Sequence, residues 1–278
     1  AGAIKDSERA VSFKPHLTQI WTLLGSLRYQ SNDLSGAIEA LKNAHEKEPN
    51  QVGHMINLGE FLRQENNLGE AAVILEKATN LAPGNANAWI NLGAVFQQGR
   101  RNEKAKVAYE KALDINPNSA AVLGNLGSFA MGSEDWDNAL QYFKRSLKFQ
   151  PDFAEIHNNL GKTLKELARM KEAEESYIQA IILRPDFIEA YSNLGVTLQE
   201  LERLEEAEAS YRKAILLKPG RAEIYYNLGN TLKELNRLEE AEASHRQAIT
   251  FNCDFAEAHS NLGVTLKEQG RLKEAEES

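Results

Sequence analysis

A constant spacing of 34 residues between small residues and between prolines constrains this chain more than any other feature. Eight glycines follow a leucine at this interval, and all seven prolines keep it as well. The glycines are Gly25, Gly59, Gly93, Gly127, Gly161, Gly195, Gly229 and Gly263, and the prolines are Pro15, Pro49, Pro83, Pro117, Pro151, Pro185 and Pro219. Such a period is typical of repeats that stack in one dimension. The chain is therefore predicted to be an array of repeats.

Each repeat has the apolar pattern of two helices. In the fifth repeat, Ile156, Leu160 and Leu164 are spaced four residues apart, and Ala173 and Tyr177 continue that spacing after a short turn. Proline follows the second helix, where its ring and its missing N–H stop further propagation. Glycine and alanine are expected where the two helix backbones approach closely. The predicted fold class is all-α.

The markers within each repeat match a known motif. Trp21 or Trp89 is at the fourth position, Leu-Gly at the seventh and eighth, alanine at the twentieth and twenty-seventh, and proline at the thirty-second. An aromatic residue such as Tyr109, Phe143 or Tyr177 is at the twenty-fourth. The chain resembles the tetratricopeptide repeat (TPR) family over nearly its whole length. The resemblance implies a right-handed α-α superhelix (TPR solenoid) of antiparallel helix pairs, whose first helices line the concave side.

The repeat boundaries follow from the same markers. Seven complete repeats are expected at 18–51, 52–85, 86–119, 120–153, 154–187, 188–221 and 222–255. Residues 1–17 are expected to be the second helix of a truncated preceding repeat, and residues 256–278 a truncated eighth repeat. Because both ends fall inside a hairpin and the sequence lacks an initiating Met, we expect a segment of a longer protein.

Charge and hydropathy exclude several classes of partner. The net charge of −8 disfavours nucleic-acid binding, which needs a basic surface against phosphate. No apolar stretch reaches the roughly 18 residues of a membrane span, so no membrane partner is expected. The single cysteine, Cys253, cannot form a disulfide within the chain, which favours a reducing compartment. The predicted location is cytoplasmic, with the nucleus as an alternative.

The acidic residues are concentrated in the second half. From Ala154 onward the sequence has 16 basic and 23 acidic residues, against 16 and 17 before it. Six glutamates in two nearly identical repeats are expected to form a solvated helix face. They are Glu205, Glu206, Glu208, Glu239, Glu240 and Glu242.

One side of each first helix is free of packing positions. On a helical wheel at about 100° per residue, positions 4, 7, 8 and 11 pack, while positions 2, 5, 6, 9, 12 and 13 form the opposite side. Position 6 is asparagine in seven of eight repeats, with Leu23 as the exception. The predicted peptide-binding residues on the concave face are therefore Asn57, Asn91, Asn125, Asn159, Asn193, Asn227 and Asn261.

A carboxamide carries both a donor and an acceptor. A row of them can pair with the N–H and C=O groups of an extended peptide whatever its side chains are. The row resembles the asparagine-lined superhelix of O-linked N-acetylglucosamine transferases, whose repeats guide protein substrates. The alternative is that these asparagines bond to neighbouring backbone or water and have a structural role.

Charged residues flank the asparagines on this side. The possible flanking contacts are Lys162, Lys165, Lys233, Lys267, Glu155, Glu189, Glu223 and Glu257. Another use of the fold, a clamp for the C-terminal carboxylate tail of chaperones, needs basic residues at positions 2, 5 and 6. Position 2 is glutamate in four repeats and position 6 is never basic, so a carboxylate would be repelled. A chaperone-tail partner is therefore disfavoured.

No catalytic, metal or cofactor site is predicted. Gly161-Lys162-Thr163 is similar to the end of a phosphate-binding loop, but Ile156 replaces the required earlier glycine. His157 and His259 occupy the fourth position, where tryptophan or tyrosine packs in other repeats, so we expect packing and not metal ligation. The chain alone is not expected to be an enzyme.

Two functions from different classes fit these observations. The first is an interaction scaffold that binds an extended peptide or partner segment on the concave face. The second is the substrate-recruiting arm of a larger transferase, such as an O-linked N-acetylglucosamine transferase-like glycosyltransferase, whose catalytic domain would lie outside this segment.

Overall fold

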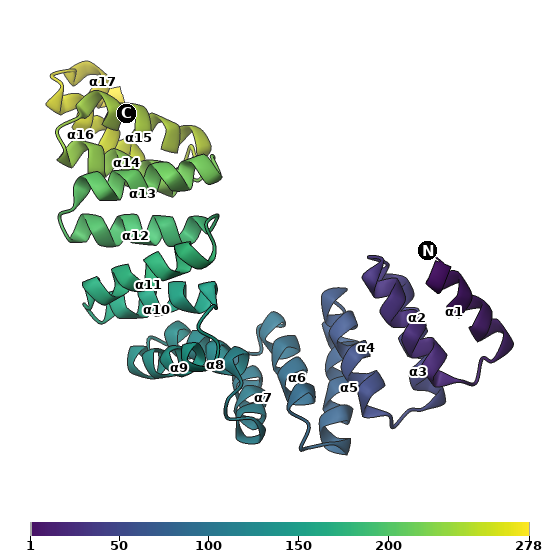
Figure 1. Cartoon of the computed structure of the whole chain (residues 1–278). Coiled ribbons are helices and arrows are strands. Elements are labelled where there is room, and N and C mark those ends of the chain that lie inside the picture. The colour runs from purple at the N-terminus through teal and green to yellow at the C-terminus, as the bar shows by residue number, and fades with distance from the viewer. Residues whose placement is uncertain (1, 278) are drawn as a thin grey trace. The chain divides into compact units, whose positions relative to one another are not determined.

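The computed structural model describes residues 2–277, and the side chains of residues 2–276. Within that range every element of regular structure is an α-helix (Figure 1). The helices are α1 (Gly2–Phe13), α2 (Thr18–Gln30), α3 (Leu34–Lys47), α4 (Val52–Gln64), α5 (Leu68–Leu81), α6 (Ala86–Gln98), α7 (Asn102–Ile115), α8 (Ala120–Gly132), α9 (Trp136–Phe149), α10 (Ala154–Glu166), α11 (Met170–Leu183), α12 (Ile188–Glu200), α13 (Leu204–Leu217), α14 (Ala222–Glu234), α15 (Leu238–Phe251), α16 (Ala256–Glu268) and α17 (Leu272–Glu277).

Helices pair within each 34-residue repeat. We call the even-numbered helices α2 to α16 the A helices and the odd-numbered helices α3 to α17 the B helices. In the fifth repeat the A helix α10 has 13 residues and the B helix α11 has 14. Helix α10 contacts both α11 and the preceding B helix α9, and the other A helices of that region pack in the same way. Each repeat therefore covers the apolar face of its neighbour.

The chain forms two compact units, Ala1–Phe129 and Ala130–Ser278, and the boundary between them falls within α8. The first unit contains the helix pairs from α2 to α7. The second contains the pairs from α10 to α17, preceded by the end of α8 and by α9.

A residue in the left-handed conformation joins the A and B helices of each repeat. Its φ is between 55° and 66° at Asn32, Asn66, Arg100, Glu134, Ala168, Glu202 and Asn236, and 79° at Gly270. Glycine and asparagine adopt this conformation at lower cost than alanine or glutamate. The next residue then bonds back to the A helix, as where the N–H of Arg203 donates to the carbonyl of Leu198 over 2.9 Å. This tight turn makes the two helices antiparallel.

The glycine at position 8 makes room for the B helix. A Cβ atom at Gly25 would lie 3.2 Å from the backbone oxygen of Ala37, as the expected close approach of backbones requires, whereas in four later repeats it would meet a ring. A Cβ atom at Gly195 would lie 2.6 Å from the ring of Tyr211, and one at Gly161 would lie 2.6 Å from the ring of Tyr177. A larger residue would displace the ring of the B helix. The alanines at positions 20 and 27, such as Ala207 at 0% exposure, complete the close packing.

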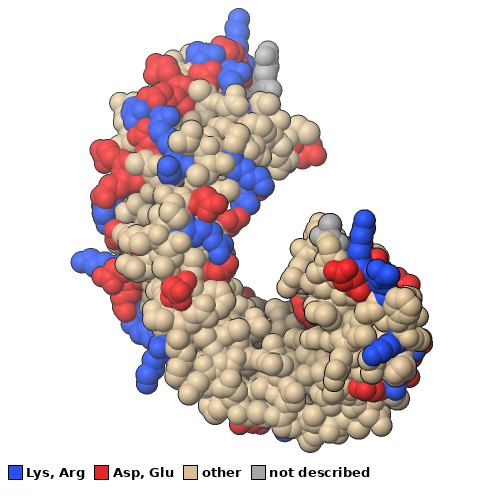
Figure 2. All heavy atoms as spheres, turned by 45° about the vertical axis from the view of Figure 1, so that its right-hand side comes forward, with Lys and Arg blue, Asp and Glu red and all other residues tan. Residues whose placement is uncertain are grey.

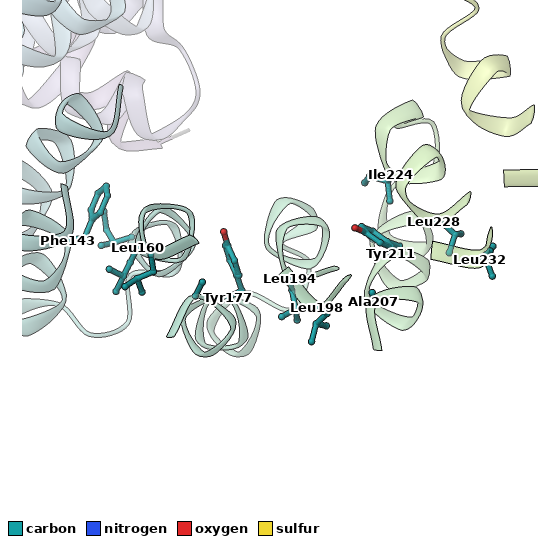
Figure 3. Packing of buried hydrophobic residues seen from close by; sticks show 14 of the residues in the cluster. Phe143, Leu160, Tyr177, Leu194, Leu198, Ala207, Tyr211, Ile224, Leu228 and Leu232 are labelled. Atoms are coloured by element: carbon teal, nitrogen blue, oxygen red, sulfur yellow. The ribbon is translucent and has the colours of Figure 1, made fainter. Parts of the chain in front are cut away.

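The core of the second unit continues from repeat to repeat (Figure 3). Tyr177 and Tyr211 from B helices are fully buried beside Leu194, Leu198 and other leucines of the A helices. Burial raises the pKa of both tyrosines. The array is therefore stabilised by contacts that two successive repeats share.

Arginines link the B helices of the second unit through Glu208 and Glu242, which are half-buried, whereas the other four glutamates of the expected solvated face are exposed. Arg237 is 2.5 Å from Glu208 of the preceding repeat and 2.7 Å from Glu240 of its own. Position 16 of one repeat lies beside position 21 of the repeat before it. This contact depends on the pitch of the array, so it could not be predicted from the spacing of the residues in the sequence. On the face that Figure 2 shows, blue and red side chains accordingly alternate over this part of the chain. The equivalent pairs are Arg203 with Glu174 and Glu206, and Arg271 with Glu242 and Glu274.

Candidate peptide-binding surface

The predicted asparagines lie on A helices, in one row per compact unit. The first row is Asn57 of α4, Asn91 of α6 and Asn125 of α8, and the second row is Asn159 of α10, Asn193 of α12, Asn227 of α14 and Asn261 of α16. Asn57 is exposed and the other six are half-buried. Position 6 is therefore accessible surface and not core.

The nitrogen of three of these asparagines reaches back to the preceding repeat. Nδ2 of Asn193 donates to Oδ1 of Asn158 over 2.9 Å, and Nδ2 of Asn261 donates to the phenol oxygen of Tyr226 over 3.1 Å. Nδ2 of Asn91 donates to a backbone carbonyl of α4 over 3.3 Å. These three acceptors belong to position 5 of the preceding repeat, and Nδ2 of Asn261 also donates to Oδ1 of Asn230, at position 9, over 2.7 Å. The carboxamide therefore also links neighbouring A helices.

The side-chain oxygens of the two rows behave differently from the nitrogens. None of the seven accepts a hydrogen bond from any residue whose side chain the structure describes. In three asparagines the side-chain nitrogen thus donates a hydrogen bond within the chain, as a structural role requires. The oxygen end is free to accept, as a binding role requires.

Buried threonines support the second row, although no role was predicted for them from the sequence. Thr163, Thr197, Thr231 and Thr265 occupy position 10 and are all 0% exposed. Each hydroxyl donates to the backbone carbonyl of the asparagine four residues earlier, as Thr197 does to Asn193 over 3.0 Å. Threonine at one position of four successive repeats was the available signal. The hydroxyl gives these carbonyls a second donor.

Of the four predicted lysines, one is engaged. Nζ of Lys165 is 2.9 Å from Glu200 of the next repeat. Lys162, Lys233 and Lys267 form no ion pair with the side chains of residues 2–276. Three ammonium groups therefore remain available on the A helices of the second unit.

Of the four predicted glutamates, two are engaged. Glu155 pairs with Arg184, and Glu189 is 2.6 Å from Arg221. Desolvation raises the pKa of Glu189, but hydrogen bonds from its own backbone N–H and from Arg221 together bring that pKa below its ordinary value. Glu223 and Glu257 are exposed and form no ion pair with the described side chains. Glu155 and Glu189 are therefore held as anions by arginine.

The A-helix surfaces of the two units differ in charge. In the first unit, positions 2, 5, 6, 9, 12 and 13 carry only Glu60 and Arg63 as charged residues, and these two pair with each other at 2.7 Å. In the second unit the same positions carry lysine or glutamate in every repeat. The A-helix surface of the first unit is therefore nearly uncharged, and that of the second carries charges of both signs.

In four repeats the ring at position 4 tethers its A helix to the preceding turn. Nε2 of His157 donates to the carbonyl of Pro151 over 2.8 Å, and Nε2 of His259 bonds in the same way to Cys253 over 3.0 Å. Trp21 makes the equivalent bond through its indole N–H. Residues 2–277 contain no group of His, Cys, Asp or Glu arranged to hold a metal ion.

None of the helices described here has the length and the apolar character that crossing a membrane requires.

Antiparallel helix pairs with a 34-residue period, four of them with a glycine against the buried ring of the B helix, define the class: a tetratricopeptide solenoid, the all-α fold that the sequence predicts. The sequence model of the family "Cilia and flagella-associated protein 70 C-terminal domain" matches residues 2–184 and 60–278. The chain belongs to this TPR family. Proteins of this fold are typically interaction scaffolds without catalytic activity. No match was found among curated proteins.

Several solved structures have the same fold. A chain of the APC/C hetero-tetramer Cut9-Hcn1 is 16% identical over 95% of this chain and 52% of that one, with a TM-score of 0.70, so this chain spans about half of its length. YrrB, described as a TPR protein with an unusual peptide-binding site, is 24% identical over 67% of this chain and 96% of its own, with a TM-score of 0.60. PilF of Pseudomonas aeruginosa is 22% identical over 74% and 94%, with a TM-score of 0.67.

Proposed function

We propose that this chain holds an extended segment of a partner protein on the A-helix surface of each unit, through the asparagine at position 6. The observation that carries the proposal is that no side-chain oxygen in the two rows accepts a hydrogen bond from the residues whose side chains are described, 2–276. An extended peptide presents N–H groups to one side at regular intervals. A row of acceptors can bond to them without reading the side chains of the peptide.

The bonds on the nitrogen side support this proposal. Because Nδ2 of Asn193 is held by Asn158, the orientation of that carboxamide is set before a peptide arrives. A preorganised acceptor loses less conformational entropy on binding than a free side chain. The structural bonds and the proposed binding role therefore reinforce each other.

The wider setting follows the same observations. The peptide-binding description of YrrB is consistent with a ligand on this fold. We place the scaffold in the cytoplasm or the nucleus, because Cys253 is a free thiol. A recruiting arm of a transferase would use the same asparagine rows, and a catalytic domain in the full reading frame would distinguish it from an adaptor.

The test is to replace Asn125, Asn159, Asn193 and Asn227 together by alanine and to measure binding to a peptide array. We expect binding to weaken for peptides of many sequences, while the helical circular dichroism signal is unchanged. The matched control replaces the exposed Asn80 and Asn102 of the B helices. Unchanged binding by the fourfold variant would contradict the proposal, and a loss of helicity would assign the asparagines a structural role.

A further inference from the structure

A small hollow opens beside the second asparagine row. Its volume is about 260 Å³, and Met131, Trp136 and Val196 contribute its apolar lining. Asn193 and Lys162 also line it, and the ring of Tyr177 belongs to the lining from α11. Sites for drug-sized ligands have volumes of roughly 300–1,000 Å³. The hollow is thus too small for such a ligand and has the size of one large side chain.

The lining departs from the repeat pattern. Position 12 is methionine only at Met131, whereas the other repeats have tyrosine, arginine, glutamine or lysine there. Position 17 is tryptophan only at Trp136, in place of leucine, methionine or asparagine. The hollow is therefore specific to this point of the array and is not a by-product of its periodic packing.

The charge at the hollow is also specific. Lys162 is the only lysine at position 9 in the chain. Its neighbour Lys165 is engaged by Glu200 at 2.9 Å, and Glu189 is engaged by Arg221, whereas the half-buried Lys162 has no ion pair with the described side chains. The lining also contains Glu166, which is exposed and forms no ion pair with the described side chains. The half-buried ammonium group of Lys162 is therefore the group that favours an anionic residue on the ligand, next to the apolar part of the hollow.

We propose that this hollow takes one bulky apolar side chain of an extended partner segment, and that an acidic residue next to it in the segment pairs with Lys162. The inference rests on the proposed function, because the asparagine row holds the same segment through its backbone. The row supplies affinity for any extended peptide, and the hollow supplies the preference for a sequence. The ligand is thus an acidic-apolar peptide motif within a longer segment.

The first test is a selection of short random peptides on the full chain. We expect enrichment of Trp, Phe, Leu or Met at one position with Asp or Glu beside it. Selected peptides without a preferred apolar position would contradict the proposed role of the hollow, but not the proposed role of the asparagine rows. A chain that binds no peptide at all would overturn both proposals.

The second test uses variants with a selected peptide. Lys162→Glu should weaken binding about fivefold, and changing the acidic residue of the peptide to lysine should restore it, as expected for one exposed ion pair. Lys171→Glu, an exposed lysine of α11 outside the hollow, is the matched control and should have no effect. Equal effects of the two variants would overturn the pairing.

The apolar part has its own variants. Trp136→Ala should weaken binding at least about tenfold, as the loss of a buried aromatic contact does. Trp136 is the first residue of α9, so its replacement could also disturb that helix. Val196→Lys is therefore a second variant, which fills the hollow from α12 and leaves α9 unchanged. Unchanged affinity in both variants would overturn the proposal. If these two variants lose affinity but the fourfold asparagine variant does not, the hollow is supported and the backbone-binding row is not.

Discussion

Nδ2 of Asn193 donates a hydrogen bond of 2.9 Å to Oδ1 of Asn158, one repeat earlier in the array. Asn227 occupies the same position of the next repeat, and its carboxamide bonds to no residue whose side chain the structure describes. Both repeats have asparagine at this position, but only the side chain of Asn193 contributes to the contact between repeats.

This difference predicts unequal effects on stability. Asn193→Ala leaves Oδ1 of Asn158, whose side chain is buried, without its donor and should lower the free energy of unfolding by about 1 kcal/mol. Asn227→Ala should leave the free energy of unfolding unchanged. Urea denaturation of both variants measures the difference, and equal effects would show that the Asn193 bond contributes nothing.

The glycine at position 8 gives a second prediction. Gly195→Ala places a methyl group against the ring of Tyr211 and should cost about 1–3 kcal/mol. Gly53→Ala is the control, because nothing lies within 4 Å of its Cβ position in helix α4, and it should stabilise by about 0.5–1 kcal/mol. Adding Tyr211→Leu to Gly195→Ala should recover part of the loss. Thermal unfolding measures all three, and a neutral Gly195→Ala would contradict the packing described.

His245 gives a prediction about pH. Burial lowers the pKa of His245 to about 4, and the nearby Lys233 adds to this effect. Because the unfolded chain binds the proton near pH 6.5 and the folded chain only near pH 4, stability should fall as the pH falls through this window. His245→Tyr, the residue found at this position in three other repeats, should lack this loss of about 3 kcal/mol. Unfolding curves at successive pH values test it, and parallel profiles for both proteins would rule it out.

The arginine network gives a prediction about salt. Desolvation raises the pKa of Glu208, but hydrogen bonds from Arg212 and Arg237 together bring it below its ordinary value. Glu208→Gln should therefore destabilise the chain by about 1 kcal/mol at low ionic strength, and the difference should shrink at high salt. Glu205→Gln on the same helix is the control, because Glu205 is exposed and forms no ion pair with the described side chains. Urea denaturation at a low and a high salt concentration measures both variants. A loss of stability in Glu208→Gln that does not change with salt would show that the loss does not come from the ion pairs.

The sequence predicts the fold class because its markers are local. Proline follows six of the seven B helices from α3 to α15, glycine is at position 8 of all eight repeats, and a ring is at position 24 of five of the seven complete repeats. Each of these markers reports on one hairpin. The helical spacing also places Asn159 and Asn193 on the side opposite the packing positions. The periodicity of the sequence is therefore sufficient to predict the helices and to predict which side of each helix packs and which side is exposed.

Contacts between repeats could not be predicted in the same way. The bond from Asn193 to Asn158 and the pair of Arg237 with Glu208 join residues 35 and 29 apart, and both depend on how far one repeat is turned against the next. The hollow near Trp136 depends on side chains from five helices. No periodic pattern predicts the hollow, because Met131, Trp136 and Lys162 are exceptions to the pattern at their positions.

The claim that the free oxygens accept the N–H groups of a peptide is tested most directly by N-methylation. Each backbone N–H of a bound peptide is methylated in turn, and the affinity is measured against the unchanged chain and against Asn193→Ala. One methylation should weaken binding to the unchanged chain by about 1 kcal/mol and should have no further effect on Asn193→Ala, because both changes remove the same hydrogen bond. Methylation effects that are identical in the two proteins at every position would contradict the account.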